Sequence, residues 1–340
     1  MTGTTRRNVL GLMVAAGTST LSTPYILQAR AQSALEKMRL RLDFLATIPH
    51  VYFFAAREKG FFAEEGLDVE ILEGNTSAQS IQQVVNKDDD FGVAGFDALV
   101  QATQEGLPAK MIICNFRSTP NVVLSLESSS IETPADLAGK IIGVRAGSGP
   151  TTMFPALMAH NDVDASKVSQ LNLDFSAFIP SLLAERIAGF VGFAPTQYPV
   201  LANLAKEPVK SLYYSQFGVV ALSMGIVAHP DTISGKPKQV AGFVRAVQRG
   251  MKWTGENRAE AEQMLVGLYP RTIKPEEARI GLELLPKFEK SARTLDAALG
   301  WVDEADAADT IALMKEYAGL KIAREPSTYY TNEFIDSSIK

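Results

Sequence analysis

The sequence predicts a two-lobed α/β protein, and three observations support this fold class. From Met38 onward, short apolar runs alternate with amphipathic helical patterns, which is typical of parallel βαβ units. The alternation starts again near Thr133, so a second unit of about the same plan follows the first. The last stretch of about ninety residues is helical with hardly a strand, and such a region packs on one of the sheets more readily than it forms its own α/β domain.

The first unit is predicted to contain four strands with single helices between them. Strands are expected at 39–44, 67–72, 91–94 and 109–114, and helices at 49–59, 77–85 and 97–103. Strands separated by single helices pair in parallel, so the carboxyl ends of these strands are expected along one edge of a sheet.

The second unit repeats this plan, and helices fill the rest of the chain. Strands are expected at 141–144, 170–173, 188–191 and 209–213, and helices at 134–138, 150–160, 179–184, 196–204, 238–254, 259–268, 275–285 and 304–317. The apolar segments 121–126 and 218–227 flank the second unit and are predicted to be hinge strands. Lobe 1 is then discontinuous, with residues 38–120 and 228–335, and lobe 2 spans 121–227 with the hinge strands.

The first 31 residues have the composition of an export signal. They contain Arg6, Arg7 and Arg30 and no acidic residue. The pair Arg6-Arg7 resembles a twin-arginine signal, a short apolar stretch follows it, and 29–31 fits a small-x-small cleavage site. This pattern predicts a signal peptide and not a membrane anchor. We therefore expect residues 1–31 to be removed, and the mature chain to be periplasmic and not membrane-spanning.

Charge and cysteine content exclude several classes of function. The net charge of −5 does not suggest a nucleic-acid surface. The one cysteine, Cys114, lies in an apolar run and is expected to be a buried hydrophobe without a catalytic role. Three scattered histidines do not form a metal-binding pattern. We expect no metal, no cofactor and no catalytic residue.

Several segments resemble one family of solute-binding proteins. The run AAREKGFFAEEGLDVE at 55–70 is specific, and DFGVAGFDA at 90–98, TPADLAGKIIGV at 133–144 and AGFVGFAP at 188–195 follow in family order. They are similar to periplasmic proteins that bind thiamine-precursor pyrimidines, alkanesulfonates, taurine or nitrate. The resemblance implies a type II periplasmic-binding-protein fold, two α/β lobes joined by two hinge strands. It also implies a permease of an ABC transporter as partner, and we expect a monomer.

The chain departs from this family at positions that bear on the ligand. Pyrimidine binders of the family commonly carry an acidic residue near the position of Ala194, and another is usual at Ala188. The related yeast pyrimidine synthases use a cysteine-rich motif, which a chain with one cysteine does not supply. These departures leave the substrate open.

Candidate ligand-binding residues follow from the position of loops. Ligands of open α/β sheets bind beyond the carboxyl ends of the strands, near helix N-termini. The predicted ligand-binding residues are Phe44, Thr47, His50, Asn75, Thr76, Phe96, Asp97, Arg145, Gly147, Ser148, Gly149, Thr151, Thr152, Phe193 and Tyr198.

The glycine-rich loop at 146–152 is the most informative of these segments. Its glycines let the backbone approach a ligand, and Ser148, Thr151 and Thr152 are expected to supply hydroxyl donors. It is not a dinucleotide fingerprint, because Thr152 stands where the third glycine belongs. The alternative is an ordinary capped helix start.

His50 and Asp97 each have two interpretations. His50 binds the ligand or has a structural role, and Asp97 accepts a hydrogen bond from an amine of the ligand or caps its helix. Arg145 is expected to pair with an anion. The aromatic side chains stack on a planar ligand or belong to the core.

These observations predict the extracytoplasmic solute-binding component of an ABC transporter. It would hold a small planar or anionic molecule, such as a pyrimidine or a sulfonate, between two lobes that close by hinge motion. Two alternatives use the same fold: an enzyme related to pyrimidine synthases, and a sensor that passes its signal to a membrane kinase.

Overall fold

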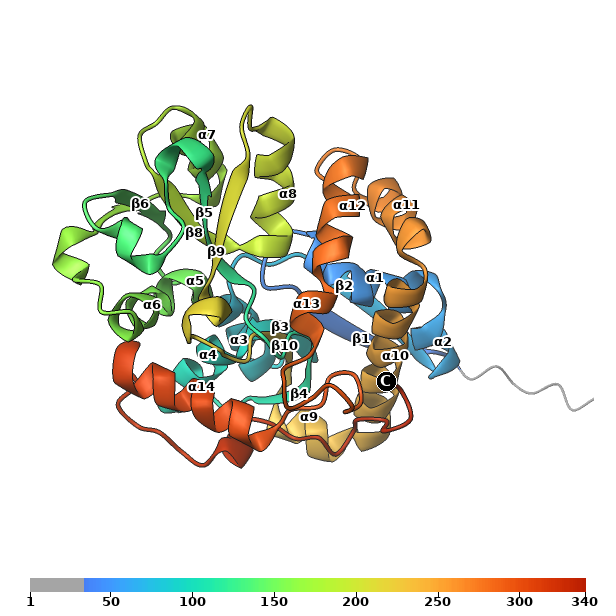
Figure 1. Ribbon diagram of the computed structural model, residues 1–340. Helices are drawn as coiled ribbons and strands as arrows, with labels where there is room; N and C mark the ends of the chain where they lie inside the picture. Colours follow the sequence, from blue (N-terminus) through green and yellow to red (C-terminus); the bar gives the residue numbers. More distant parts are fainter. Residues whose placement is uncertain (1–33) are drawn as a thin grey trace, which may run out of the picture. The chain divides into compact units, whose positions relative to one another are not determined.

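The computed structural model describes residues 34–340, and these contain two five-stranded mixed sheets (Figure 1). The first sheet has the strand order β2-β1-β3-β10-β4, and the second has the order β7-β6-β8-β5-β9. The predicted α/β fold class is therefore confirmed. The predicted signal peptide, residues 1–31, lies outside the described residues.

The strands of the two sheets have the following bounds. The first sheet contains β1 (Glu36–Arg41), β2 (Leu67–Leu72), β3 (Phe91–Gly95), β4 (Lys110–Cys114) and β10 (Met224–Ala228). The second contains β5 (Asn121–Leu126), β6 (Ile141–Val144), β7 (Ser169–Asn172), β8 (Gly189–Phe193) and β9 (Val209–Tyr213).

One strand in each sheet comes from the other half of the chain. β10 follows β9 in sequence but pairs antiparallel with β3 and β4, and β5 follows β4 but pairs antiparallel with β8 and β9. Of the two segments predicted as hinge strands, 121–126 is β5 itself and the end of 218–227 belongs to β10, so both contribute strands to the sheets. The links between the sheets are 115–120 and 214–223, and the Ser223 N–H donates to the Phe116 carbonyl over 2.9 Å. The lobe boundaries themselves stay a prediction.

Helices cover both faces of the sheets. Most lie where the sequence predicts them, but three short ones, α2, α9 and α13, are additional. The α-helices are α1 (Val51–Glu58), α2 (Phe61–Glu64), α3 (Ser77–Val85), α4 (Phe96–Gln104), α5 (Gly149–Thr152), α6 (Phe154–His160), α7 (Phe175–Leu183), α8 (Ala194–Leu204), α9 (Pro230–Gly235), α10 (Pro237–Glu256), α11 (Arg258–Leu268), α12 (Pro275–Leu284), α13 (Pro286–Glu289) and α14 (Glu304–Tyr317).

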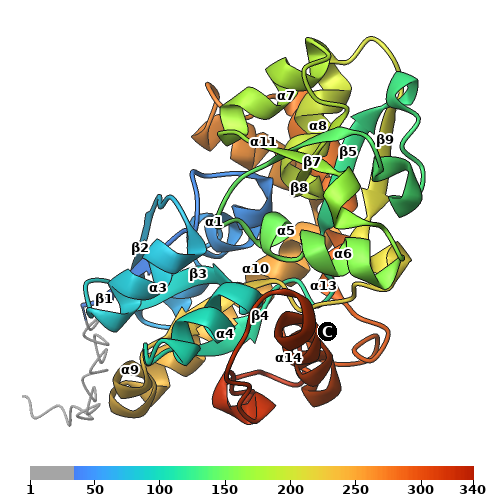
Figure 2. The same ribbon diagram turned by 90° about the vertical axis from the view of Figure 1, so that its left-hand side faces the viewer.

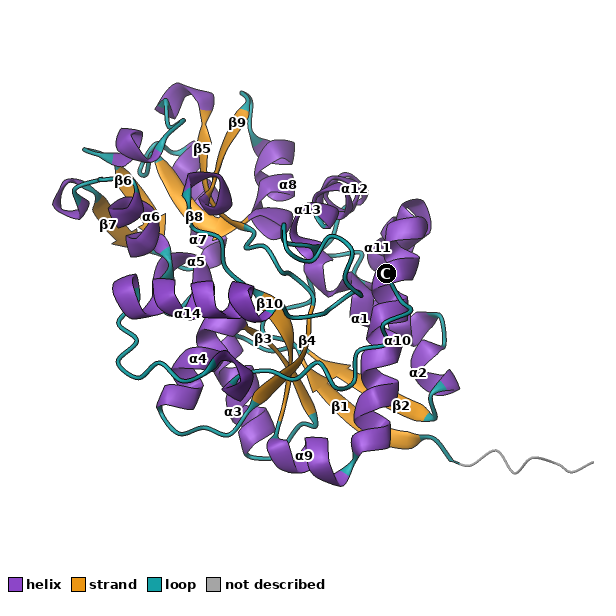
Figure 3. Cartoon of the chain, turned by 60° about the horizontal axis from the view of Figure 1, so that its bottom comes forward, coloured by secondary structure: helices purple, strands orange, loops and turns teal. Residues whose placement is uncertain are grey.

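Two hydrophobic clusters form the core, one on each face of the sheets. Successive side chains of a strand point to opposite faces, so Val93 and Ala94 of β3 belong to different clusters. The cluster around Val93 includes residues of α1 and α10, and the cluster around Ala94 includes residues of α3 and α4. Figure 3 shows these two pairs of helices on either side of the first sheet. Each cluster continues over the second sheet, through Leu124 on one face and Val123 on the other.

Two local differences from the predicted elements matter for the site. The first strand ends at Arg41 and not at residue 44, so Asp43 and Phe44 lie in the loop after β1. The helix expected at 150–160 is divided into α5 and α6. Pro155 explains the division, because it has no N–H to donate and its ring clashes with the carbonyl four residues earlier.

The helices at the C-terminal end of the chain pack beside both sheets. α10 packs on α1 beside the first sheet, whereas α12 packs on α8 beside the second. Within residues 34–340, no helix combines the length and apolar character that crossing a membrane requires.

Candidate functional site

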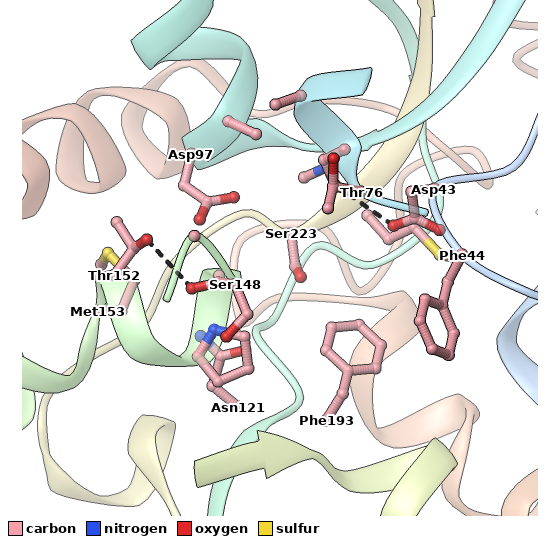
Figure 4. Close-up of a pocket in the computed structure, with 18 of the residues that line it drawn as sticks. Asp43, Phe44, Thr76, Asp97, Asn121, Ser148, Thr152, Met153, Phe193 and Ser223 are labelled. Carbon is pink, nitrogen blue, oxygen red and sulfur yellow. Dashed lines mark hydrogen bonds between the residues drawn. The ribbon is translucent and has the colours of Figure 1, made fainter. Parts of the chain in front are cut away.

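A cavity of about 500 Å³ lies where the strand ends of the two sheets face each other (Figure 4). Twelve of the fifteen predicted ligand-binding residues line it: Phe44, Thr47, His50, Asn75, Thr76, Asp97, Arg145, Gly147, Ser148, Gly149, Thr152 and Phe193. We name its two sides by the sheet that carries them. The first wall is Asp43, Phe44, Thr47, His50, Asn75, Thr76, Ser77 and Asp97, and the second wall is Asn121, residues 145–150, Thr152, Phe175 and Phe193.

The three other predicted residues do not line the cavity. Phe96 is fully buried, and its ring packs edge-on against Tyr329 at 6.1 Å between centroids. The Thr151 hydroxyl oxygen accepts the Arg145 backbone N–H over 3.1 Å, so this side chain holds its own loop. Tyr198 on α8 is partly buried against the core.

On the first wall, Asp43 and His50 form a fixed pair. The Thr47 N–H donates to His50 Nδ1 over 3.1 Å, so the imidazole proton lies on Nε2. His50 Nε2 then donates to Asp43 Oδ1 over 3.0 Å. The Ser77 hydroxyl lies 3.4 Å from Asp43 Oδ2. His50 is 2% exposed, so it acts mainly by orienting the Asp43 carboxylate.

Asp97 is the second carboxylate of the first wall. Burial raises its pKa, backbone N–H groups of Ala98 and Asp97 oppose the shift, and the charge of Asp43 raises the pKa further. Its hydrogen bonds are to these backbone groups, and no side chain in the part of the chain that the structure describes donates to its carboxylate. The carboxylate therefore keeps acceptor capacity that faces the cavity (Figure 4).

The Asp97 carboxylate reaches the opposite wall at Gly149. A Cβ atom at Gly149 would lie 3.1 Å from Asp97 Oδ2, which is closer than nearly all real contacts of this kind. Glycine at this position lets the second wall approach the carboxylate. The close approach brings groups of both walls to one point of the cavity.

Arg145 and two aromatic rings form a stacked group on the other side of the cavity. The Phe44 and Phe175 rings meet edge to face, with centroids 5.3 Å apart. The Arg145 guanidinium carbon lies 4.4 Å from the Phe175 centroid and 5.9 Å from that of Phe44. The positive charge is thus held against ring faces, a favourable cation–π geometry.

The hydroxyls of the second wall are turned toward their own loop. The Ser148 hydroxyl lies 2.9 Å from the Arg145 carbonyl and 3.0 Å from the Thr151 hydroxyl. The Thr152 hydroxyl donates to the Ser148 carbonyl over 3.1 Å. These donors are already used within the loop, although the Ser148 side chain makes no cap hydrogen bond at the start of α5, so the alternative of an ordinary capped helix start does not describe it. The loop's contact with a ligand stays a prediction.

Several cavity residues lie outside the predicted set: Asp43, Ser77, Asn121, Phe175, Gln197 and Ser223. Asp43 was expected within the first strand, and Phe175 lies before the predicted start of its helix at 179. Asn121 begins β5, and Ser223 lies just before β10. Because β5 and β10 run antiparallel to their neighbours, their amino ends meet the carboxyl ends of the other strands. Searching only carboxyl ends overlooks such residues.

Cys114 has no role at the cavity. It is fully buried, and burial raises the pKa of its thiol to about 12, so the thiol stays protonated at neutral pH. Among residues 34–340, no group of three or more His, Cys, Asp or Glu side chains is placed to hold a metal ion.

A sequence model of one protein family, described as NMT1/THI5 like, matches residues 47–261, more than half of the chain. The chain belongs to the NMT1/THI5-like family. The family resemblance found in the sequence is therefore confirmed. Relatives of this NMT1/THI5-like protein include a formylaminopyrimidine-binding protein of Halalkalibacterium halodurans, 24% identical over 294 residues, which are 82% of this chain and 88% of the relative.

Other comparisons show a relative with an enzyme name and the shared fold. A 4-amino-5-hydroxymethyl-2-methylpyrimidine phosphate synthase of Legionella pneumophila is 26% identical over 270 residues, 78% of this chain and 84% of the relative. Among solved structures, the periplasmic aliphatic sulphonate binding protein SsuA of Escherichia coli superposes with a TM-score of 0.72 at 14% identity. The superposition covers 88% of this chain and 99% of that protein. The predicted periplasmic-binding-protein fold is confirmed.

Proposed function

We propose that this NMT1/THI5-like protein is the extracytoplasmic solute-binding component of an ABC transporter. It captures a small planar molecule between its two walls and delivers it to a permease. The observation that carries the proposal is the 500 Å³ cavity, which combines ring faces with carboxylates at the strand ends of both sheets.

The charges on the cavity favour a ligand that donates hydrogen bonds over an anion. Three carboxylates line the cavity, those of Asp43, Asp97 and Glu105. The cationic side chain Arg145 is stacked on Phe175. His50 supplies no free donor, because its Nε2 proton points at Asp43. A sulfonate or nitrate would be placed beside carboxylates, whereas an amino group on a heteroaromatic ring would find acceptors.

The aromatic residues suit a flat ligand. Phe44, Phe175 and Phe193 lie along the cavity from both sheets. A planar ring buried between such side chains gains apolar burial and favourable stacking. We therefore place an amino-substituted heteroaromatic ring at the head of the site, between the aromatic group and Asp97.

Delivery and export complete the proposed role. A clamp of this fold closes on its ligand by hinge bending, and the closed form docks on the permease. The two links between the sheets, 115–120 and 214–223, are short and tied to each other by the bond from Ser223 to Phe116. Removal of residues 1–31 during export gives the mature periplasmic protein.

The synthase named among the relatives makes an enzyme the second candidate. This relative is 26% identical to the present chain over 270 residues. Against this candidate, the thiol of Cys114 is buried and protonated at neutral pH, and it does not line the cavity.

Ligand screening tests the proposal. Purified mature protein is tested by calorimetry with 4-amino-5-hydroxymethyl-2-methylpyrimidine, riboflavin, ethanesulfonate and nitrate, and bound ligand is recovered for mass spectrometry. We expect an amino- or N–H-bearing heteroaromatic compound to bind and to be recovered unchanged, and the two anions not to bind. Binding of the anions alone contradicts the ligand class, and chemical conversion of the bound compound supports the enzyme.

A further inference from the structure

The cavity has an arm that the head of the site does not use. We call it the α4 arm and define it by Ala98, Gln101, Ala102, Glu105, Leu107, Ala221, Leu222 and Thr310. We propose that the ligand has two parts, a heteroaromatic head at Asp97 and an uncharged or cationic tail that extends along α4. This inference rests on the proposed function and narrows its ligand class.

One face of a helix forms the floor of the arm. Asp97, Ala98, Gln101, Ala102 and Glu105 line the cavity, and their spacing of three to four residues places them on one side of α4. At about 1.5 Å per residue, the distance along the helix from Asp97 to Glu105 is about 12 Å. The arm thus begins at the head carboxylate and ends at the surface.

The opposite side of the arm comes from distant parts of the chain. Ala221 and Leu222 belong to the link before β10, and Thr310 lies on α14, which packs beside α4 (Figure 2). The Thr310 hydroxyl accepts the Leu222 N–H over 2.9 Å and donates to the Asp306 carbonyl over 2.7 Å. This side of the arm is therefore fixed in place, and its hydrogen bonds are already made.

The volume of the cavity exceeds what a single ring fills. Pockets for drug-sized ligands have volumes of about 300–1,000 Å³, and a substituted pyrimidine, with about ten non-hydrogen atoms, is smaller than such ligands. The cavity holds about 500 Å³. The remaining space can accept a second ring or a short chain, as in pockets that bind larger ligands.

The chemistry of the arm determines which tails fit. Its lining is mostly apolar, through Ala98, Ala102, Leu107 and Leu222, and Glu105 lies exposed at its outer end. The basic residues of the cavity, Arg145 and His50, lie at the head. A phosphate or carboxylate on the tail would meet Glu105, and within residues 34–340 no cationic side chain lines the arm to balance it, so an anionic tail is disfavoured.

Matched ligand pairs test the arm. The heads alone are 4-amino-5-hydroxymethyl-2-methylpyrimidine and lumichrome, and the extended forms are thiamine and riboflavin. Thiamine phosphate and riboflavin phosphate carry anionic tails. Each methylene-sized group removed from water contributes roughly fourfold in affinity. Where a head compound binds, we therefore expect its extended form to bind at least about tenfold tighter than the head alone. The phosphorylated form is expected to lose this gain of about tenfold in affinity.

Two variants assign the effect to the arm. Ala102→Leu fills the arm and is expected to abolish the gain of the extended form without changing the affinity of the head. Glu105→Lys, on an exposed helix end, is expected to raise the affinity of the phosphorylated form. Glu256→Lys is the matched control, because Glu256 is also exposed at a helix end and does not line the cavity.

The outcomes separate the inference from the proposed function. Equal affinity of head and extended form, or equal effects of Ala102→Leu on both, overturns the two-part ligand and leaves the solute-binding function standing. If Ala102→Leu does not fold, the response of the phosphorylated form to Glu105→Lys decides, and no response overturns the proposal. Binding of none of the compounds overturns both the proposed heteroaromatic ligand and the tail.

Discussion

Both walls of the cavity carry polar side chains, but they use them differently. In the loop that supplies the second wall, the hydroxyls of Ser148, Thr151 and Thr152 bond to the backbone and to each other. On the first wall, the carboxylate of Asp97 faces the cavity, and its partners among residues 34–340 are backbone groups. Asp43 is held by His50 and Ser77 but also lines the cavity.

This difference shows that a polar side chain beside a cavity can already be engaged in other hydrogen bonds and so is not necessarily free to bind a ligand. A hydroxyl has one proton, and a short glycine-rich loop has unpaired carbonyls nearby that accept it. A carboxylate has several acceptor positions, so it can bond to backbone and still bind a donor. Ligand selection is therefore expected to depend more on the first wall than on the second.

The largest effect is expected at Asp97. Asp97→Asn keeps the shape of the side chain and removes the charge. A hydrogen bond to a charged group contributes about 1.5–3 kcal/mol, so the affinity for an amino-substituted heteroaromatic ligand should fall about tenfold to 150-fold by calorimetry. Asp68→Asn, an exposed strand residue, is the control. An unchanged affinity would show that the first wall does not select the ligand.

A smaller effect is expected at Asp43. Its carboxylate already accepts from His50 Nε2 and lies near the Ser77 hydroxyl, so less acceptor capacity remains for the ligand. Asp43→Asn should weaken binding about threefold to tenfold, less than Asp97→Asn in the same titration. A loss larger than that of Asp97→Asn would reverse the order of the two carboxylates.

The second wall is expected to change affinity least. Ser148→Ala combined with Thr152→Val removes two hydroxyls that bond within the loop. Each lost bond costs about 1 kcal/mol of folding stability, so the denaturation midpoint should fall while affinity changes less than about threefold. Affinity lost tenfold at constant stability would instead make these hydroxyls ligand donors, as the sequence predicts.

The stability of the ligand-free protein provides a test that does not require a ligand. Burial raises the pKa of Asp97, so its charged form destabilises the folded state. This destabilisation grows as the pH rises from the ordinary pKa of aspartate to the raised pKa of Asp97 in the folded protein. Above the raised pKa it is constant. Asp97→Asn should therefore melt at a higher temperature than the wild type at pH 8, with a gap that shrinks as the pH falls. A gap that widens at low pH would refute this assignment.

Local sequence patterns predicted most helices and strands, because the formation of these elements depends largely on neighbouring residues. The helices at 77–85 and 304–317 and the strands at 67–72 and 209–213 have the predicted bounds. Asp43 was placed in a strand because the alternation of side chains continues past Arg41, although the pairing of β1 ends there. Strand ends depend on the partner strand, which local periodicity does not contain.

The sequence by itself determined the α/β class, the family and the loops that contribute to the cavity, since these follow from periodicity, motifs and the order of elements. Only the tertiary structure decided that β5 and β10 exchange sheets, and so brought Asn121 and Ser223 to the cavity. It also decided that the hydroxyls of Ser148 and Thr152 bond within their loop. The physical reason is that strand pairing and the direction of a hydroxyl depend on partners that fold into place, and the identity of a residue does not specify them.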